Sequence, residues 1–195
     1  FHISDIKSVF AGLRPLAASE GNKDHTKEIS RHHKITVSTS GLINVLGGKW
    51  TTYRKIAEDA INAAISINRL KKKKCKTEKL KLAGYKKVVD WNDPMHVYGS
   101  QKKKVESLGG INDNKSLSKK FHITNNIIEW SIIHEMALTI EDVLARRTRS
   151  IFLDAKESKR IAPEVAKKMA EVLEKDQKWI DEELKNFNKL IKNYI

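Results

Sequence analysis

Apolar residues recur every third or fourth position through the second half of this 195-residue chain, and this spacing limits the fold more than any other feature. A period of about 3.6 residues gathers such side chains on one face of a helix. The most regular stripe steps by four, three, four and three residues, at Ile180, Leu184, Phe187, Ile191 and Tyr194. We therefore predict core-forming helices here and assign no chemistry to their apolar faces.

Helix-capping residues predict where the other helices of this half begin. We expect a short helix from Ser100 to about Leu108, a helix capped by Thr124 that runs through Met136, a capping box of Thr139 and Asp142 that opens residues 140–151, and a helix whose first residue is Pro163. Together these segments predict a small helical bundle.

The first third of the chain has short extended stretches instead of helical stripes. Residues 8–13 form the first stretch, and residues 34–38 and 42–46 flank the turn residues Ser40 and Gly41. The last two stretches predict a β-hairpin. Its second strand is almost entirely apolar, which is typical of a central strand.

A glycine pair, Gly47 and Gly48, ends this second strand and leads through Lys49 into a helix. Backbone N–H groups at a helix N-terminus stabilise an anion or the electron-rich edge of a ligand, and glycines let it approach closely. Lys49 adds a positive charge, and the hydroxyls of Thr51 and Thr52 supply caps or ligand contacts. The spacing does not fit a Walker loop. A tight strand-to-helix turn with an exposed lysine explains it equally well.

The 38 Lys and Arg residues outnumber the 24 Asp and Glu residues, for a net charge of +14. Such an excess favours nucleic-acid binding, because released counterions stabilise the complex. The excess is mostly Lys, in runs at 71–74 and 102–104 that contain no aromatic residue, so we favour a solvated surface over a nucleic-acid partner. No apolar run approaches the roughly 20 residues of a membrane-spanning helix.

Other candidate side chains carry weaker signals. Arg14, held by the following proline, is suited to a carboxylate or phosphate, although a surface ion pair is the commoner role. His32 and His33 point to opposite faces of a strand, so we expect no metal site there. Cys75 lies among lysines but has no neighbouring base that would make it a nucleophile.

Three arginines lie close together at 146, 147 and 149 and would suit a phosphate. Because Glu141 and Asp142 lie one turn upstream, we favour an intramolecular ion-pair network. The sequence contains no complete catalytic constellation of a known type.

These patterns predict an α+β chain that is mostly α-helical. Residues 1–68 are expected to contain the short β segment, the glycine-lysine corner and one helix, residues 69–76 a Lys-rich linker, and residues 77–195 an α-helical C-terminal domain.

Several of these segments occur together, in this order, in one known family. The matching motifs are Ala-Gly-Leu-Arg-Pro-Leu at 11–16, Ser-Arg at 30–31, Gly-Gly-Lys-Trp-Thr-Thr-Tyr-Arg-Lys at 47–55, Ala-Glu-Asp-Ala at 57–60, Glu-Met-Ala at 135–137, Glu-Asp-Val-Leu-Ala-Arg-Arg-Thr-Arg at 141–149 and Phe-Leu-Asp-Ala at 152–155. Over nearly its whole length, the sequence resembles the C-terminal portion of FAD-dependent, quinone-linked glycerol-3-phosphate dehydrogenases.

The resemblance implies that the intact enzyme oxidises sn-glycerol 3-phosphate to dihydroxyacetone phosphate, with FAD accepting the hydride and a membrane quinone receiving the electrons. It implies that residues 1–68 end the FAD- and substrate-binding domain. The implied site residues are Arg14, Arg31 and Lys49 at the substrate, and Gly48, Trp50, Thr51 and Thr52 along the flavin. Three cations near a helix N-terminus match a dianionic phosphate in charge.

The dinucleotide-binding Gly-x-Gly-x-x-Gly motif is absent and the chain begins at Phe1, so we interpret the sequence as the tail of a larger flavoenzyme. We expect no tight FAD binding and no turnover by these residues alone. Two other functions stay open: a glycerol-phosphate oxidase that uses oxygen, and a basic helical module for an acidic partner. We expect a cytoplasmic location, peripheral at the inner face of the cell membrane. Contact with anionic lipid or a homodimer partner stays open.

Overall fold

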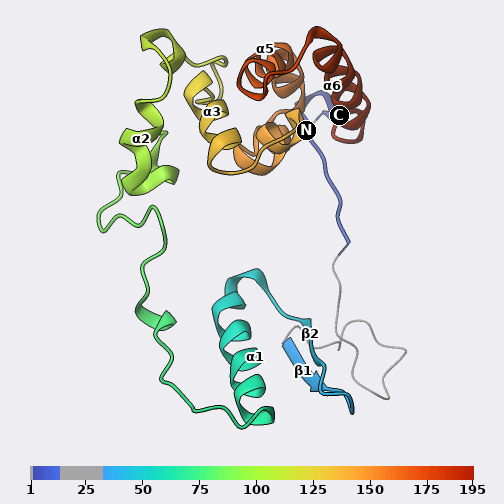
Figure 1. Ribbon diagram of the computed structural model, residues 1–195. Helices are drawn as coiled ribbons and strands as arrows, with labels where there is room; N and C mark the ends of the chain where they lie inside the picture. The colour runs from blue at the N-terminus through green and yellow to red at the C-terminus, as the bar shows by residue number, and fades with distance from the viewer. Residues whose placement is uncertain (1, 14–32) are drawn as a thin grey trace. The chain divides into compact units, whose positions relative to one another are not determined.

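The computed structural model describes residues 2–13 and 33–195, and the chain divides into two compact units (Figure 1). We call residues Gly12–Lys81 the hairpin unit, and Phe1–Ala11 together with Leu82–Ile195 the helical unit. Within the described residues, no helix is long and apolar enough to cross a membrane.

The hairpin unit contains the predicted β-hairpin. Strands β1 (His33–Val37) and β2 (Ile43–Gly47) pair antiparallel, with Val37 opposite Ile43. The turn is closed by Ser38, whose Oγ accepts a hydrogen bond from Leu42 N at 3.0 Å. After a 3-10 turn at Trp50–Thr52, helix α1 (Tyr53–Ile67) packs against the hairpin. The strand–glycine–helix order predicted from the sequence is therefore confirmed.

Strand β2 is not central among the described residues, because it pairs only with β1. Its apolar side chains Val45 and Leu46 remain 42% and 50% exposed. After α1, residues 70–76 have no regular structure, and a 3-10 turn follows at Thr77–Lys79. The domain boundaries expected at 68 and 77 stay predictions.

The helical unit is built around α3 (Asn125–Ile133), α5 (Ala155–Leu173) and α6 (Gln177–Leu190), which lie together in Figure 1. Shorter elements complete it: the 3-10 helix η5 (His96–Gln101), α2 (Lys102–Glu106), the π-helical turn η7 (Asp142–Arg147) and α4 (Ser150–Leu153). The largest fully buried side chains include Ile128, Ile140, Leu144, Ile151, Ile161 and Met169. The mostly helical α+β class is thus confirmed.

The N-terminal segment of the chain belongs to the helical unit. The backbone C=O of Lys7 accepts from Ala155 N at 3.1 Å, and Val9 N donates to the C=O of Tyr194 at 2.9 Å. The Phe10 ring packs edge-on against Phe152 at a centroid distance of 5.0 Å. The stretch predicted from residue 8 is therefore extended. Among the described residues, however, it hydrogen-bonds to the ends of helices and not to a strand.

Two predicted helix starts are confirmed. Thr124 Oγ1 accepts from Ile127 N at 3.2 Å and caps α3. Thr139 and Asp142 form the reciprocal capping box: Thr139 Oγ1 accepts from Asp142 N at 3.1 Å, and Asp142 Oδ2 accepts from Thr139 N at 3.0 Å. The stripe from Ile180 onwards lies on α6 and the 3-10 turn after it, and Phe187 and Ile191 are buried.

Other helix boundaries were wrong for local reasons. The N-cap of α2 is Gln101, because Ser100 lies inside η5. The helix capped by Thr124 ends at Ile133, before Met136, whose φ is positive at 57°. Residues 140–151 do not form one helix, because Arg149 adopts φ 59° between η7 and α4.

Pro163 is not a first helical residue. It lies inside α5, which begins after Asp154, whose carboxylate accepts from Glu157 N at 2.9 Å. Proline removes one hydrogen bond from a helix, and the carbonyl left without a donor belongs to Lys159. Both Pro163 and Lys159 lie on the exposed face of α5, where a missing helical hydrogen bond costs less than in the core.

Candidate functional site

The glycine-lysine corner joins β2 to α1 through two backbone conformations that favour glycine. Gly47 and Gly48 have φ of 68° and 96°, and Lys49 returns to an extended φ of −122°. The C=O of Lys49 accepts from both Thr52 N and Thr52 Oγ1, each at 3.0 Å. The corner is therefore a tight turn fixed by its own backbone.

Gly48 is also required by packing inside the hairpin unit. A Cβ placed there would lie 2.6 Å from Ile56 Cδ1 and 3.4 Å from His33 Cβ. The space beside this glycine is therefore filled by α1 and β1, so the absent side chain serves the approach of helix to strand.

The N-terminus of α1 carries no side-chain cap. The hydroxyl of Thr52 donates to the turn instead, so of the two roles expected for it, a cap or a ligand contact, the structure does not show the cap. Lys49 and Thr51 are exposed beside the first turn, whose unpaired backbone N–H groups form the positive end of the helix dipole. Trp50 is 86% exposed and stacks on Tyr53 at 5.5 Å.

These residues fit an anionic group or one edge of a flavin ring. Lys49, the uncapped helix end and the exposed Trp50 ring offer charge, donors and a flat apolar surface. Gly48, Thr51 and Thr52 lie on the same short turn. Arg14 and Arg31, the other predicted substrate contacts, lie outside the described residues.

A contact between His33 on β1 and Asp59 on α1 links the hairpin to the helix. His33 Nε2 lies 2.9 Å and Lys55 Nζ 2.8 Å from the two oxygens of Asp59. The hydrogen bond from Lys55, with that from His33, lowers the pKa of the Asp59 carboxyl. Nothing in the sequence pattern identified Asp59 as the link between β1 and α1, because the two residues meet only after the chain reverses.

Arg54 links α1 to the segment that follows it. Its Nη1 lies 2.9 Å from Glu58 Oε2 and 3.2 Å from Thr77 Oγ1. Cys75 Sγ lies 3.0 Å from Thr77 Oγ1 and 3.8 Å from the same Arg54 nitrogen. In residues 2–13 and 33–195, no three His, Cys, Asp or Glu side chains are grouped to hold a metal ion.

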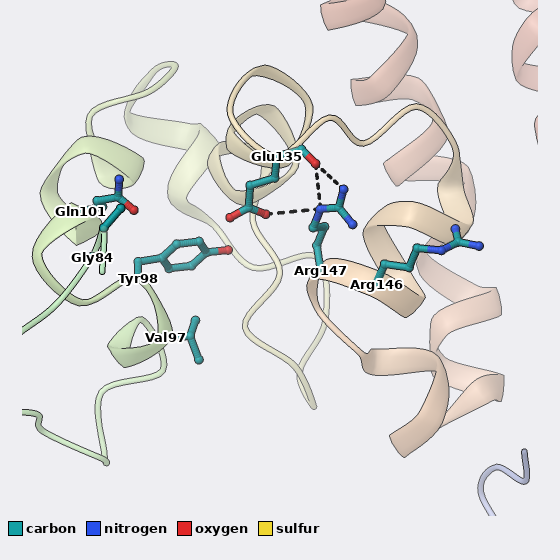
Figure 2. Close-up of a pocket in the computed structure, with 8 residues that line it drawn as sticks. Gly84, Val97, Tyr98, Gln101, Glu135, Arg146 and Arg147 are labelled. Carbon is teal, nitrogen blue, oxygen red and sulfur yellow. Dashed lines mark hydrogen bonds and ion pairs between the residues drawn. The ribbon is translucent and has the colours of Figure 1, made fainter. Parts of the chain in front are cut away.

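The helical unit has an open hollow of about 480 Å³ lined by Tyr98, Glu135 and Arg147, among others (Figure 2). Arg147 Nε donates to the backbone C=O of Glu135 at 3.0 Å, and its Nη2 donates to the same oxygen. Burial, with the nearby Glu135 charge, raises the pKa of the Tyr98 hydroxyl. Tyr98 was missed at the sequence level, because a lone tyrosine outside a motif carries no signal.

The predicted ion-pair network around Arg146 is confirmed. Its Nη1 lies 2.8 Å from Asp142 Oδ1, and its Nη2 lies 2.8 Å from Glu141 Oε1. Arg147 turns instead to Glu135, and Arg149 is exposed. The three arginines therefore have three different environments.

Comparison with known proteins identifies the family. Residues 75–180, which include both Glu135 and Arg147, match the model of the C-terminal domain of alpha-glycerophosphate oxidase. The chain belongs to this family. The resemblance noted from the sequence motifs is thereby confirmed.

Similarity to curated relatives extends across both units. The chain is 33% identical to "Probable glycerol-3-phosphate dehydrogenase, mitochondrial" of Dictyostelium discoideum, over 98% of this chain and 33% of that protein. It is 32% and 31% identical to "Glycerol-3-phosphate dehydrogenase, mitochondrial" of Bos taurus and Homo sapiens, over 96% of this chain and 28% of each relative. The chain thus spans about a third or less of the relatives' length.

Proposed function

We propose that these 195 residues are the C-terminal part of an enzyme that oxidises sn-glycerol 3-phosphate to dihydroxyacetone phosphate. One observation carries the proposal: similarity to glycerol-3-phosphate dehydrogenases covers 96% or more of the chain in the bovine, human and Dictyostelium proteins. It therefore includes the glycine-lysine corner as well as the helical unit.

FAD, when bound, supplies the acceptor for the hydride that leaves C2 of the substrate. The chain's own residues bind and orient. Lys49 lies exposed beside an uncapped helix end, so it is suited to hold the substrate phosphate, together with Arg14 and Arg31. Gly48, Trp50, Thr51 and Thr52 would lie along the flavin, where the positive end of α1 stabilises negative charge.

A glycerol-phosphate oxidase is the second candidate, because the matching family model is described by an oxidase. The two functions share substrate and cofactor and differ in the electron acceptor. Full-length enzyme given glycerol 3-phosphate without added quinone distinguishes them. Rapid oxygen uptake supports the oxidase, whereas the absence of oxygen uptake together with reduction of an added quinone analogue supports the dehydrogenase.

The partners and location follow from the dehydrogenase proposal. A quinone acceptor requires the enzyme to reach a membrane, and we propose peripheral attachment on the cytoplasmic side. Attraction between the Lys-rich surface and anionic lipid would strengthen that attachment. A homodimer contact is a further proposed role for the helical unit.

Substitution of Lys49 tests the substrate assignment in the full-length enzyme. For Lys49→Met, we expect the KM for glycerol 3-phosphate to rise about tenfold or more, because a charge-assisted contact to phosphate is lost. Lys34→Met is the matched control, since Lys34 is also exposed in the hairpin unit but lies on β1. Equal KM values for the two variants would refute the role of Lys49.

A further inference from the structure

A second hollow in the helical unit, which we call the arginine hollow, is rich in positive charge. It has a volume of about 490 Å³, within the roughly 300–1,000 Å³ typical of ligand pockets. Its lining includes four basic side chains, Lys120, His122, Arg147 and Arg149, and no Asp or Glu. Such a lining favours an anion.

Arg149 is the most informative residue of the arginine hollow. Its backbone adopts φ 59° and ψ 13°, a left-handed conformation that costs a residue other than glycine about 1 kcal/mol. Its side chain is exposed and has no hydrogen bond or ion pair to any residue the structure describes. No contact within the described protein therefore explains an arginine at this strained position.

The neighbouring cations are held in place by contacts outside the lining. Arg147 donates through Nε and Nη2 to the C=O of Glu135, and its Nε lies 3.7 Å from the Glu135 carboxylate oxygen Oε2. Its Nη1 has no acceptor among the residues that the structure describes. Lys120 Nζ lies 2.6 Å from Asp154 Oδ2, so its charge is largely matched. The unmatched positive charge therefore centres on Arg149, and Arg147, two residues before it, adds the donor Nη1.

The rest of the lining is mostly apolar, with the hydroxyl-bearing Tyr98 and Thr148 as its two exceptions. Val97 is 71% exposed and Phe121 is half-buried, and both contribute to the hollow above the buried Ile123. A ligand that fits this arrangement carries a compact negative group at one end and an apolar body at the other.

We propose that the arginine hollow binds a small phosphate monoester with an apolar body, with Arg149 and Arg147 contacting the phosphate. The proposal goes beyond the oxidation of glycerol 3-phosphate, and none of the lining residues belongs to the glycine-lysine corner. The phosphate could come from a soluble ester or from a lipid headgroup, and the experiment below separates these sources.

Calorimetric titration of the 195-residue chain with phenyl phosphate and with inorganic phosphate tests the proposal. The key variant is Arg149→Gly, because glycine adopts φ 59° without strain and should fold at least as stably. Arg69→Gly is the matched control: it removes the same charge from a residue with φ 50°, in the hairpin unit.

We expect phenyl phosphate to bind the unmodified chain and Arg69→Gly equally, and to bind Arg149→Gly about tenfold or more weakly. Inorganic phosphate should bind more weakly than phenyl phosphate, because it leaves the apolar wall uncovered. The unfolding midpoint of Arg149→Gly should be unchanged or raised. Equal affinity of Arg149→Gly and the unmodified chain, or no binding of either probe, would overturn the proposal.

Vesicles of phosphatidylcholine containing phosphatidic acid identify the source of the phosphate. Vesicle binding that is lost in Arg149→Gly, retained in Arg69→Gly and displaced by phenyl phosphate supports a lipid headgroup. Binding of phenyl phosphate with no Arg149-dependent vesicle binding supports a soluble ester.

Discussion

The two units of this chain differ in how completely they bury their apolar residues. The helical unit has a continuous core that includes Ile128, Leu144 and Met169, all fully buried. In the described part of the hairpin unit no residue is buried, and Val45, Leu46 and Trp50 are exposed. A two-stranded hairpin is marginally stable by itself. We therefore expect the hairpin unit, which carries the candidate substrate contacts, to be less stable than the helical unit.

The long helices of the helical unit are capped at their N-termini, whereas the helix of the hairpin unit is not. Helices α3, α5 and α6 each begin with a side chain that accepts from a first-turn N–H group: Thr124, Asp154 and Asp176. Helix α1 has no such cap. An uncapped N-terminus costs stability but leaves donors for an anion, so the weaker unit is also the one suited to bind.

Truncation of core side chains should give the largest contrast between the units. Leu144→Ala should lower the free energy of unfolding of the helical unit by about 3 kcal/mol or more, because the side chain is fully buried. Ile56→Ala, at a half-buried position of α1, should cost about 1 kcal/mol. Urea titration followed by circular dichroism measures both. Equal losses would contradict the contrast.

A methyl group at Gly48 should be the most damaging small change in the hairpin unit. Gly48→Ala combines a positive φ with the contact to Ile56 Cδ1 and should reduce the stability of α1 by about 2 kcal/mol. Gly41→Ala is the control, because it shares a positive φ but meets no atom within 4 Å. Ile56→Val removes Cδ1 and should partly rescue Gly48→Ala. Amide exchange of α1 measures the loss of stability. If Ile56→Val leaves the exchange of the Gly48→Ala variant unchanged, the contact with Ile56 Cδ1 is not the cause of that loss.

Glu157 should make the helical unit sensitive to acid. Hydrogen bonds from Arg160 and from Ser118 Oγ, the latter at 2.5 Å, lower the pKa of Glu157 from 4.5 to about 2. The unfolded chain protonates Glu157 at a higher pH than the folded chain does. The ionised Glu157 carboxylate therefore contributes its full share to the free energy of unfolding above about pH 5, and this share is lost as the pH falls towards 2. Glu157→Gln should cost about 1–2 kcal/mol at neutral pH and flatten the acid limb. Urea titrations at several pH values test this, and an unchanged pH profile would count against it.

Removal of single caps should give the smallest effects. Thr124→Ala should destabilise the helical unit by about 1 kcal/mol, because Ile127 N loses its acceptor. Thr52→Ala should change α1 by a few tenths of a kcal/mol, since its hydroxyl caps nothing. Thermal unfolding of both variants measures the two losses of stability. A larger loss for Thr52→Ala than for Thr124→Ala would contradict the prediction.

Local signals in the sequence predicted the parts of the fold that depend on neighbouring residues. The hairpin around Gly41, the cap at Thr124 and the box of Thr139 and Asp142 each involve residues a few positions apart. The π-turn before Arg149 and the course of α5 through Pro163 were not predicted, because core packing and solvent exposure outweigh local propensity there.

The candidate site was predictable to the same limited extent. The glycine-lysine corner followed from its spacing. The second role of the corner is to let α1 approach the hairpin, because Ile56 fills the space beside Gly48. This role and the link between His33 and Asp59 depend on tertiary packing that no motif records. Tyr98 and the arginine hollow likewise arise from segments far apart in the chain.

Hydrogen exchange of the 195-residue chain, measured segment by segment, tests most directly whether one unit supports itself and the other does not. We predict that the slowest amides of α3 and α5 exchange at least about a hundredfold more slowly than those of α1 and β2, because only the former surround a closed core. Equal protection of α1 and α5 would contradict this account.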